Sequence, residues 1–128
     1  MHRTTLTLAL ILFSTVAQAE WIAFGSDASR TGYIDKTSIK TSGKRVTMTY
    51  LLDYRKPQKL DNKGYLSFKS EAEFDCEAEE YRPILAVFLS GNMGEGKVLI
   101  SKGLQESGPV EPGTIAGNLF KLACGIED

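Results

Sequence analysis

Histidine and cysteine are scarce in this sequence. Its 128 residues include one histidine, His2, and two cysteines, Cys76 and Cys124. His2 lies in a leader that we expect to be removed, so the mature chain has no histidine. This excludes the Ser–His–Asp and Cys–His pairs of the common hydrolases and the commonest zinc ligand. We therefore predict a protein that is not an enzyme and has no catalytic residue, metal site or cofactor, although a calcium site made only of carboxylates stays open.

The chain also has no apolar run long enough to span a membrane. The longest, residues 6–16, has about 11 residues, whereas a spanning helix needs about 20. It follows the positive start Met1-His2-Arg3 and precedes the small residues of Ala17-Gln18-Ala19, which is the layout of a secretory signal peptide. We predict a signal peptide over residues 1–19 and a single domain over residues 20–128. No cysteine follows the apolar run, so we expect no lipid anchor.

Neither sign of charge is in excess. The sequence has 15 lysines and arginines against 16 aspartates and glutamates, and removal of Arg3 shifts this balance by one more unit toward negative. A nucleic-acid-binding protein needs a basic surface to neutralise phosphates, and a polybasic membrane binder needs a similar surface. We therefore expect a partner other than nucleic acid or a membrane, with the oligomeric state left open.

The two cysteines predict a disulfide. Export places Cys76 and Cys124 in a compartment where disulfides persist, and two cysteines allow one intramolecular pairing. They lie far apart in the sequence, so they do not form a Cys-x-x-Cys redox motif. A reactive thiol or a bridge between two chains is the alternative to a structural Cys76–Cys124 bond.

Alternation of apolar and polar residues predicts strands. Residues 45–54 and 65–76 show it best, and in the second of these one face is apolar and ends in Cys76. Shorter strands are expected over residues 21–24, 33–35 and 97–101. The apolar run 81–90 fits a central strand, with a buried helix as the alternative.

A short helix is expected at the end of the chain. Ile115, Leu119, Leu122 and Ala123 recur at helical spacing, with Thr114 as the N-cap and Gly125 as the C-terminal stop. We predict an α+β fold, an antiparallel sheet of about five to six strands with one C-terminal helix packed on one face. The disulfide would tie this helix to the sheet.

One candidate binding site emerges from the loops. The polar stretch 55–64 reads as a loop, and it concentrates positive charge between Tyr54 and Tyr65. Loops often carry function, so this patch is a tentative site for a protein or polysaccharide. Its members are Arg55, Lys56, Lys59 and Lys63.

Two further features have simpler interpretations. Glu71, Glu73 and Asp75 share one strand face, and we interpret them as a solvated charged face rather than as the carboxylate pair of a glycosidase. Residues 91–96 are rich in glycine, but a strand follows them instead of the helix of a phosphate-binding loop. We interpret this segment as a hairpin turn.

The order and spacing of several stretches resemble the bacterial surface-adhesin E family. They cover nearly all of the mature chain and include Tyr33-Ile34-Asp35 to Ile39, Val46 to Tyr54, Glu73-Phe74-Asp75-Cys76, Ser90-Gly91-Asn92-Met93-Gly94, and Pro112-Gly113-Thr114 to Cys124. The resemblance implies an antiparallel sheet with a C-terminal helix tied to it by a disulfide. It also implies binding of host extracellular-matrix or serum proteins at a bacterial surface.

Two other classes of function remain open. A soluble exported chain of this size fits a periplasmic protein inhibitor, similar to lysozyme inhibitors, or an envelope-maintenance module. A carrier that holds a small ligand between helix and sheet is the third option. Filling of that space by Phe68, Phe74, Leu119 and Leu122 would argue against such a carrier. We expect the protein in the periplasm or secreted.

Overall fold

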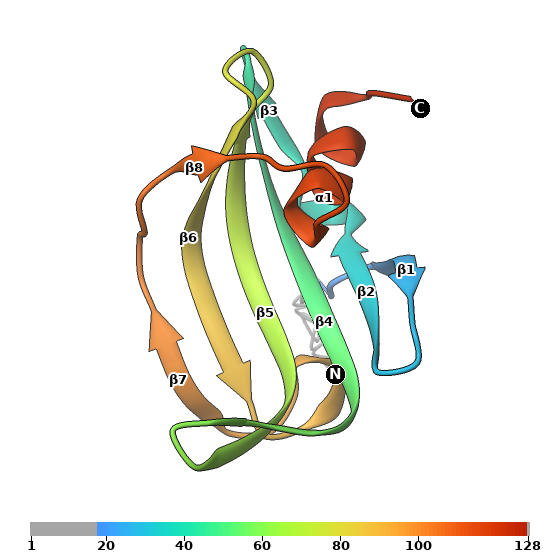
Figure 1. Ribbon diagram of the computed structural model, residues 1–128, viewed down its shortest axis with the longest axis vertical. Helices are drawn as coiled ribbons and strands as arrows, with labels where there is room; N and C mark the ends of the chain where they lie inside the picture. Colours follow the sequence, from blue (N-terminus) through green and yellow to red (C-terminus); the bar gives the residue numbers. More distant parts are fainter. Residues whose placement is uncertain (1–17, 128) are drawn as a thin grey trace, which may run out of the picture.

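A computed structural model describes residues 18–127, so most of the predicted signal peptide lies outside the described residues and stays a prediction. The described chain forms one antiparallel sheet with the order β1-β2-β4-β5-β6-β7, in which β3 also pairs with β4 and β8 with β6. Helix α1 (Ile115–Cys124) lies across one face of this curved sheet (Figure 1). The strands are β1 (Trp21–Ser26), β2 (Arg30–Asp35), β3 (Lys40–Ser42), β4 (Arg45–Leu60), β5 (Lys63–Asp75), β6 (Glu80–Leu89), β7 (Val98–Lys102) and β8 (Gly108–Pro109).

The α+β architecture is confirmed, but the expected number of strands is wrong. The sheet has eight strands instead of five to six. Two of the additional strands, β3 and β8, have only three and two residues, too few to show an alternating pattern. The pairing, rather than the sequence pattern, defines them.

The expected loop over residues 55–64 is also wrong. Strand β4 runs on to Leu60 and β5 starts at Lys63, so the two form a long hairpin that turns at Asp61 and Asn62. Both turn residues have positive φ angles, 49° and 65°, which suits the twist of a two-residue hairpin turn. The segment looked like a loop because most of its side chains are exposed, and because a bulge between Asp53 and Gln58 accommodates Pro57.

Helix α1 (Ile115–Cys124) begins and ends where its capping residues predict. The Thr114 hydroxyl accepts a hydrogen bond from the Gly117 amide at 3.0 Å, and Gly125 ends the helix in the left-handed conformation. The expected apolar stripe is wrong at one position, because Leu122 is 50% exposed. The buried face is centred between Leu119 and Phe120, which turns Leu122 toward solvent.

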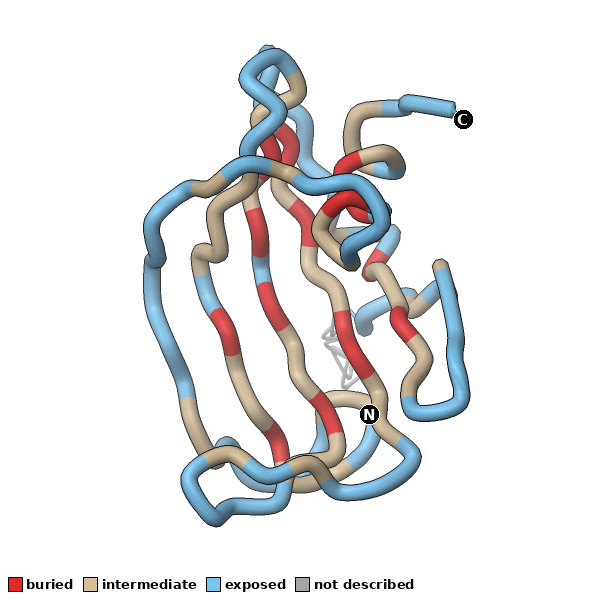
Figure 2. The backbone as a smooth tube through the Cα atoms, viewed as in Figure 1, coloured by how far each residue is buried: buried red, intermediate tan, exposed pale blue. Residues whose placement is uncertain are grey.

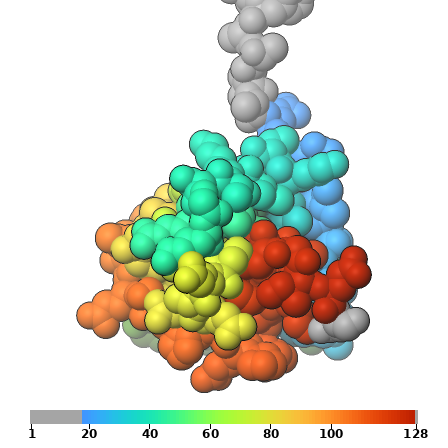
Figure 3. All heavy atoms as spheres, turned by 90° about the horizontal axis from the view of Figure 1, so that it is seen from above, coloured from blue at the N-terminus to red at the C-terminus, as the bar shows by residue number. Residues whose placement is uncertain are grey.

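The core lies between α1 and one half of the sheet. Met48, Ala72 and Phe74 are buried from the sheet side, and Leu119 and Phe120 from the helix. The Cys76–Cys124 disulfide is confirmed, and it joins the end of β5 to the end of α1. Seen from above, α1 accordingly lies beside the β5–β6 turn (Figure 3). Where β4 and β5 contribute to this core, buried positions alternate with less buried ones, as at Val46 and Met48 and at Ala72 and Phe74 (Figure 2).

The short helical turn η2 (Asn92–Gly94) covers part of the sheet's opposite face. Ser67 is fully buried there, and its hydroxyl donates to the Gly91 carbonyl at 2.6 Å and accepts from the Gly94 amide at 3.0 Å. The Asp53 carboxylate accepts from the Met93 amide at 2.8 Å. The glycine-rich segment 91–96 is therefore more than a hairpin turn, since it closes one end of this face.

Candidate functional site

The structure does not gather the four cations of the tentative patch into one surface. The Arg55 guanidinium donates to the Asp27 carbonyl at 2.7 Å and to the Ser26 hydroxyl at 3.1 Å, which ties it to the β1–β2 turn. Lys59 and Lys63 are exposed on the β4–β5 hairpin, where they pair with Gly64 and Leu60 and so point to opposite faces. Lys56 is exposed near the bulge.

The β1–β2 turn is organised by a carboxylate. Asp27 accepts hydrogen bonds from the Ser29 amide at 2.7 Å, the Ser29 hydroxyl at 2.8 Å and the Arg30 amide at 2.9 Å. The Ser29 hydroxyl, followed by the two amides, lowers the pKa of Asp27 to about 2. Asp27 therefore stays charged at any pH well above 2 and holds the backbone of Arg30 in the turn.

A titration tests this account of the turn. Carbon-detected NMR of the Asp27 carboxyl should give a midpoint near 2, because the hydrogen bonds favour the ionised form. The contribution of Asp27 to stability is present above the unfolded pKa of about 3.9 and is lost as the pH falls through the folded value. Ser29→Ala should raise the midpoint, whereas Ser42→Ala, at an exposed position in β3, should not. An unchanged midpoint in Ser29→Ala would contradict the assignment.

A groove of about 970 Å³ lies between the β1–β2 hairpin and the segment that leads into α1. Its floor is apolar, with Tyr50 and Leu52 from β4 and Phe24 from β1, and Phe24 packs directly over Gly32. Its rim carries both signs of charge. The charged members are Asp27, Arg30 and Glu111.

A chain of five aromatic rings, here called the aromatic row, starts at this groove. The row follows the order Tyr50, Phe68, Phe88, Tyr65 and Tyr54, with successive ring centroids 5.9, 4.8, 5.0 and 5.7 Å apart. Such tilted and edge-on contacts are the geometries that aromatic pairs prefer. Tyr50 packs against the hydrophobic cluster beneath α1, whereas the other four rings of the row are outside that cluster.

Arg30 links the far end of the aromatic row back to the groove. Its guanidinium lies 6.0 Å from the centre of the Tyr54 ring and donates to the Tyr54 hydroxyl at 3.3 Å. Burial is the largest cause that raises the pKa of Tyr50 and of Tyr65. The phenols therefore stay neutral at physiological pH and offer hydrogen-bond donors together with their apolar rings.

Sequence reasoning missed the aromatic row because its members come from three strands. Each ring alone fits a half-buried strand position, and all five are half-buried in the structure. The sequence did show two members of the row, because Tyr54 and Tyr65 flank the tentative patch. Only the register, which pairs Tyr50 with Ser70 and Phe68 with Phe88, brings the other rings beside them.

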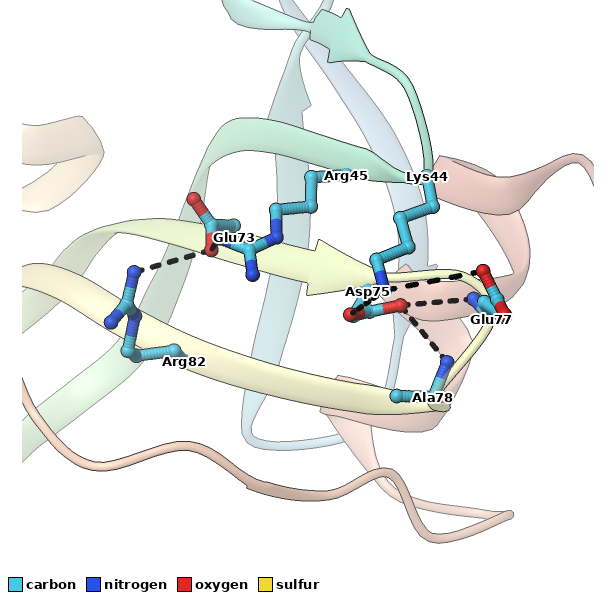
Figure 4. A network of polar contacts seen from close by, with 7 residues as sticks. All are labelled: Lys44, Arg45, Glu73, Asp75, Glu77, Ala78 and Arg82. Carbon is cyan, nitrogen blue, oxygen red and sulfur yellow. Dashed lines mark hydrogen bonds and ion pairs between the residues drawn. The ribbon is translucent and has the colours of Figure 1, made fainter.

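The charged face predicted on β5 lies on the opposite side of the sheet. Figure 4 shows Glu73 between Arg45 and Arg82, at 3.5 and 3.2 Å. Asp75 accepts from the Glu77 and Ala78 amides at the β5–β6 turn, and these bonds, that of Ala78 first, lower its pKa. These carboxylates are held in a surface network. Among residues 18–127 no group of three acidic, cysteine or histidine side chains could hold a metal ion.

The fold and the groove define the class of the protein: a small disulfide-closed sheet with one helix and an open, aromatic-lined face. The model of the surface-adhesin protein E family matches residues 21–125. The chain therefore belongs to the surface-adhesin E family, which confirms the resemblance seen in the sequence. No curated protein sequence matches the chain closely enough to count as a relative.

Solved structures of Haemophilus influenzae protein E share the fold. One superposes with a TM-score of 0.63 at 17% identity and covers 87% of this chain and 88% of that chain. A second crystal form gives a TM-score of 0.62 at 17% identity, with 73% and 80% covered. Within the described part of the chain, no helix has the length and hydropathy needed to cross a membrane.

Proposed function

We propose that this protein is a non-enzymatic surface adhesin that binds a host extracellular-matrix or serum protein with its groove and aromatic row. Membership of the surface-adhesin E family supports the adhesive role. The observation that carries the site is the aromatic row itself, a continuous set of rings of which all but Tyr50 are outside the cluster packed beneath α1.

The composition of this face supports a protein partner. Tyrosine and arginine are enriched among the residues that dominate binding energy in protein interfaces, and Tyr54, Tyr65 and Arg30 meet at one point here. Protein interfaces also have an apolar centre and a polar rim. The groove has that arrangement, with Leu52 and Tyr50 on its floor and charges on its rim.

A binding assay compares this face with the cationic patch. Immobilised extracellular-matrix glycoproteins and serum proteins serve as the probe panel, and affinities are measured by surface plasmon resonance. The double variant Tyr54→Ala/Tyr65→Ala should weaken binding about 30-fold or more, the effect of losing an interface hot spot. Lys59→Ala/Lys63→Ala, a matched pair on the same hairpin, should change affinity only a few-fold and mainly through the association rate.

The reverse pattern would reject the aromatic row and return the site to the lysines of the hairpin. Circular dichroism and the melting temperature of both double variants show that a loss of binding is not a loss of fold. If neither pair changes affinity for a probe that binds the wild-type protein, the proposed site is wrong.

Protease shaving of intact cells distinguishes a surface adhesin from a periplasmic inhibitor or envelope-maintenance module. An adhesin is expected to be cleaved from the cell surface or found in the medium. A protein that resists the protease and leaves with the periplasmic fraction would contradict adhesion. A lysozyme-inhibition assay with the purified protein would then test the inhibitor alternative directly.

A further inference from the structure

The backbone nitrogen of Glu20 lies against a buried carboxylate. It donates to Asp35 Oδ1 at 3.1 Å, and the Glu20 carbonyl accepts from the Lys36 amide at 3.1 Å. Trp21, the first residue of β1, pairs with Asp35 in the sheet. The folded domain therefore begins at Glu20, at the residue that follows the predicted cleavage motif.

Asp35 carries more charge than its neighbours can balance. It is only 9% exposed, and its Oδ1 atom also accepts from the Thr37 amide at 3.0 Å and the Thr37 hydroxyl at 2.7 Å. All these donors are neutral. No ion pair of Asp35 with a lysine or arginine is present in the described part of the chain. A buried carboxylate without a counter-charge is costly, because burial removes its hydration.

We propose that the Ala19–Glu20 bond is a proteolytic processing site whose product, the α-ammonium group of Glu20, forms a partly buried ion pair with Asp35. Hydrolysis by a signal peptidase adds water across the peptide bond. Ala19 leaves as a carboxylate on the leader, and the nitrogen of Glu20 keeps its electron pair and gains two protons to become an ammonium. This inference uses the predicted leader and is independent of the partner proposed above.

The geometry suits an ammonium better than an amide. A peptide nitrogen has one hydrogen to donate, and it already points at Asp35 Oδ1. An ammonium at the same place has three hydrogens and a positive charge, and charge-assisted hydrogen bonds are about twice as strong as neutral ones. Processing would thus supply the counter-charge that Asp35 lacks and fix the start of β1 at the sheet edge.

None of the titratable side chains around Asp35 supplies the positive charge that the ammonium would supply. The Glu20 side chain and Lys36 are exposed beside it. On the next strands, Lys40 stands opposite Thr47 and Glu71 opposite Thr49, and both are exposed. Ser38 and Thr49, which pack near Asp35 from η1 (Lys36–Ser38) and β4, do not titrate.

The test compares two forms of the domain that differ in one residue. One starts at Glu20 with a free amine, and the other retains Ala19, so that the Glu20 nitrogen is again an amide. At pH 7 the form that starts at Glu20 should melt about 4 °C higher. The gain should be complete below the ordinary α-amino pKa of about 8 and should disappear by about pH 10.5, because the ammonium loses its proton as the pH rises through its raised folded value.

Asp35→Asn in both forms is the matched control. It should abolish the difference between them, whatever it does to the stability of each. A difference that persists in Asp35→Asn or at pH 10.5 would overturn the ion pair, and so would equal melting temperatures at pH 7. If Asp35→Asn does not fold, the pH series on the two wild-type forms still tests whether the ion pair exists. Mass spectrometry of the exported protein must give Glu20 as its first residue, and any other start overturns the processing site.

Discussion

Replacing both cysteines with alanine is expected to lower the free energy of unfolding by about 4 kcal/mol. The bond between Cys76 and Cys124 closes a loop with a sequence separation of 48, and the chain-entropy model gives a loop of that size roughly this value. A domain of ordinary stability has about 5–15 kcal/mol in total. The double variant should therefore fold only marginally and melt at a much lower temperature.

The position of the bond is the reason to expect its full effect. It ties the last residue of α1 to the residue that follows β5. The chain between β7 and α1 is held to the sheet by the two-residue strand β8, by a few hydrogen bonds and by the packing of Val110 against the core. Without the bond, α1 depends for its attachment on the packing of Leu119 and Phe120, together with the partly buried Ile115 and Ala123.

Urea unfolding of the oxidised wild-type protein and of Cys76→Ala/Cys124→Ala measures the difference. Wild-type protein treated with dithiothreitol should match the double variant, which separates the bond from the two side-chain changes. A loss below about 1 kcal/mol would show that packing alone holds α1. The same dependence would limit the folded protein to oxidising compartments, which agrees with the predicted export.

Local patterns in the sequence were enough to predict the elements that they govern. Alternation located the two long strands, Thr114 and Gly125 bounded the helix, and two cysteines behind a predicted signal peptide left one internal bond. Each of these features depends on residues close in sequence or on simple counting.

Features that depend on strand register could not be predicted in the same way. Ser67 is buried because η2 folds over it, and Leu122 is exposed because the helix contacts the sheet through Leu119 and Phe120. The aromatic row needs the pairing of Phe68 with Phe88, which the sequence does not reveal. The tentative patch was chosen from composition, and composition does not show that Arg55 is bound to the β1–β2 turn.

The second large effect is expected from Phe74→Ala, which should cost about 3–5 kcal/mol, the usual range for a buried phenylalanine. Phe74 is 1% exposed beneath α1, and its ring contacts those of Tyr81 and Phe120. Leu122→Ala, at an exposed position of the helix, should change stability by no more than about 0.5 kcal/mol. Equal losses in the two variants would mean that α1 does not pack as described.

Phe68 provides the comparison that links stability to function. It lies on the same strand and face as Phe74. Phe68 is not part of the cluster beneath α1, however, and is half-buried in the aromatic row. Because part of the Phe68 side chain stays exposed and the hydrophobic contribution scales with the area removed from water, Phe68→Ala should cost less stability than Phe74→Ala. Its effect on binding to a matrix or serum protein should nevertheless be larger, since Phe74 offers no surface to a partner.

The two phenylalanines thus separate the roles of the two halves of the sheet. Measured at a temperature where both variants are folded, Phe74→Ala should keep its affinity and Phe68→Ala should lose it. Loss of affinity in Phe74→Ala alone would place the binding surface on α1 instead of on the aromatic row. The outcome that we expect leaves the covered half to hold the fold and the open half to meet the partner.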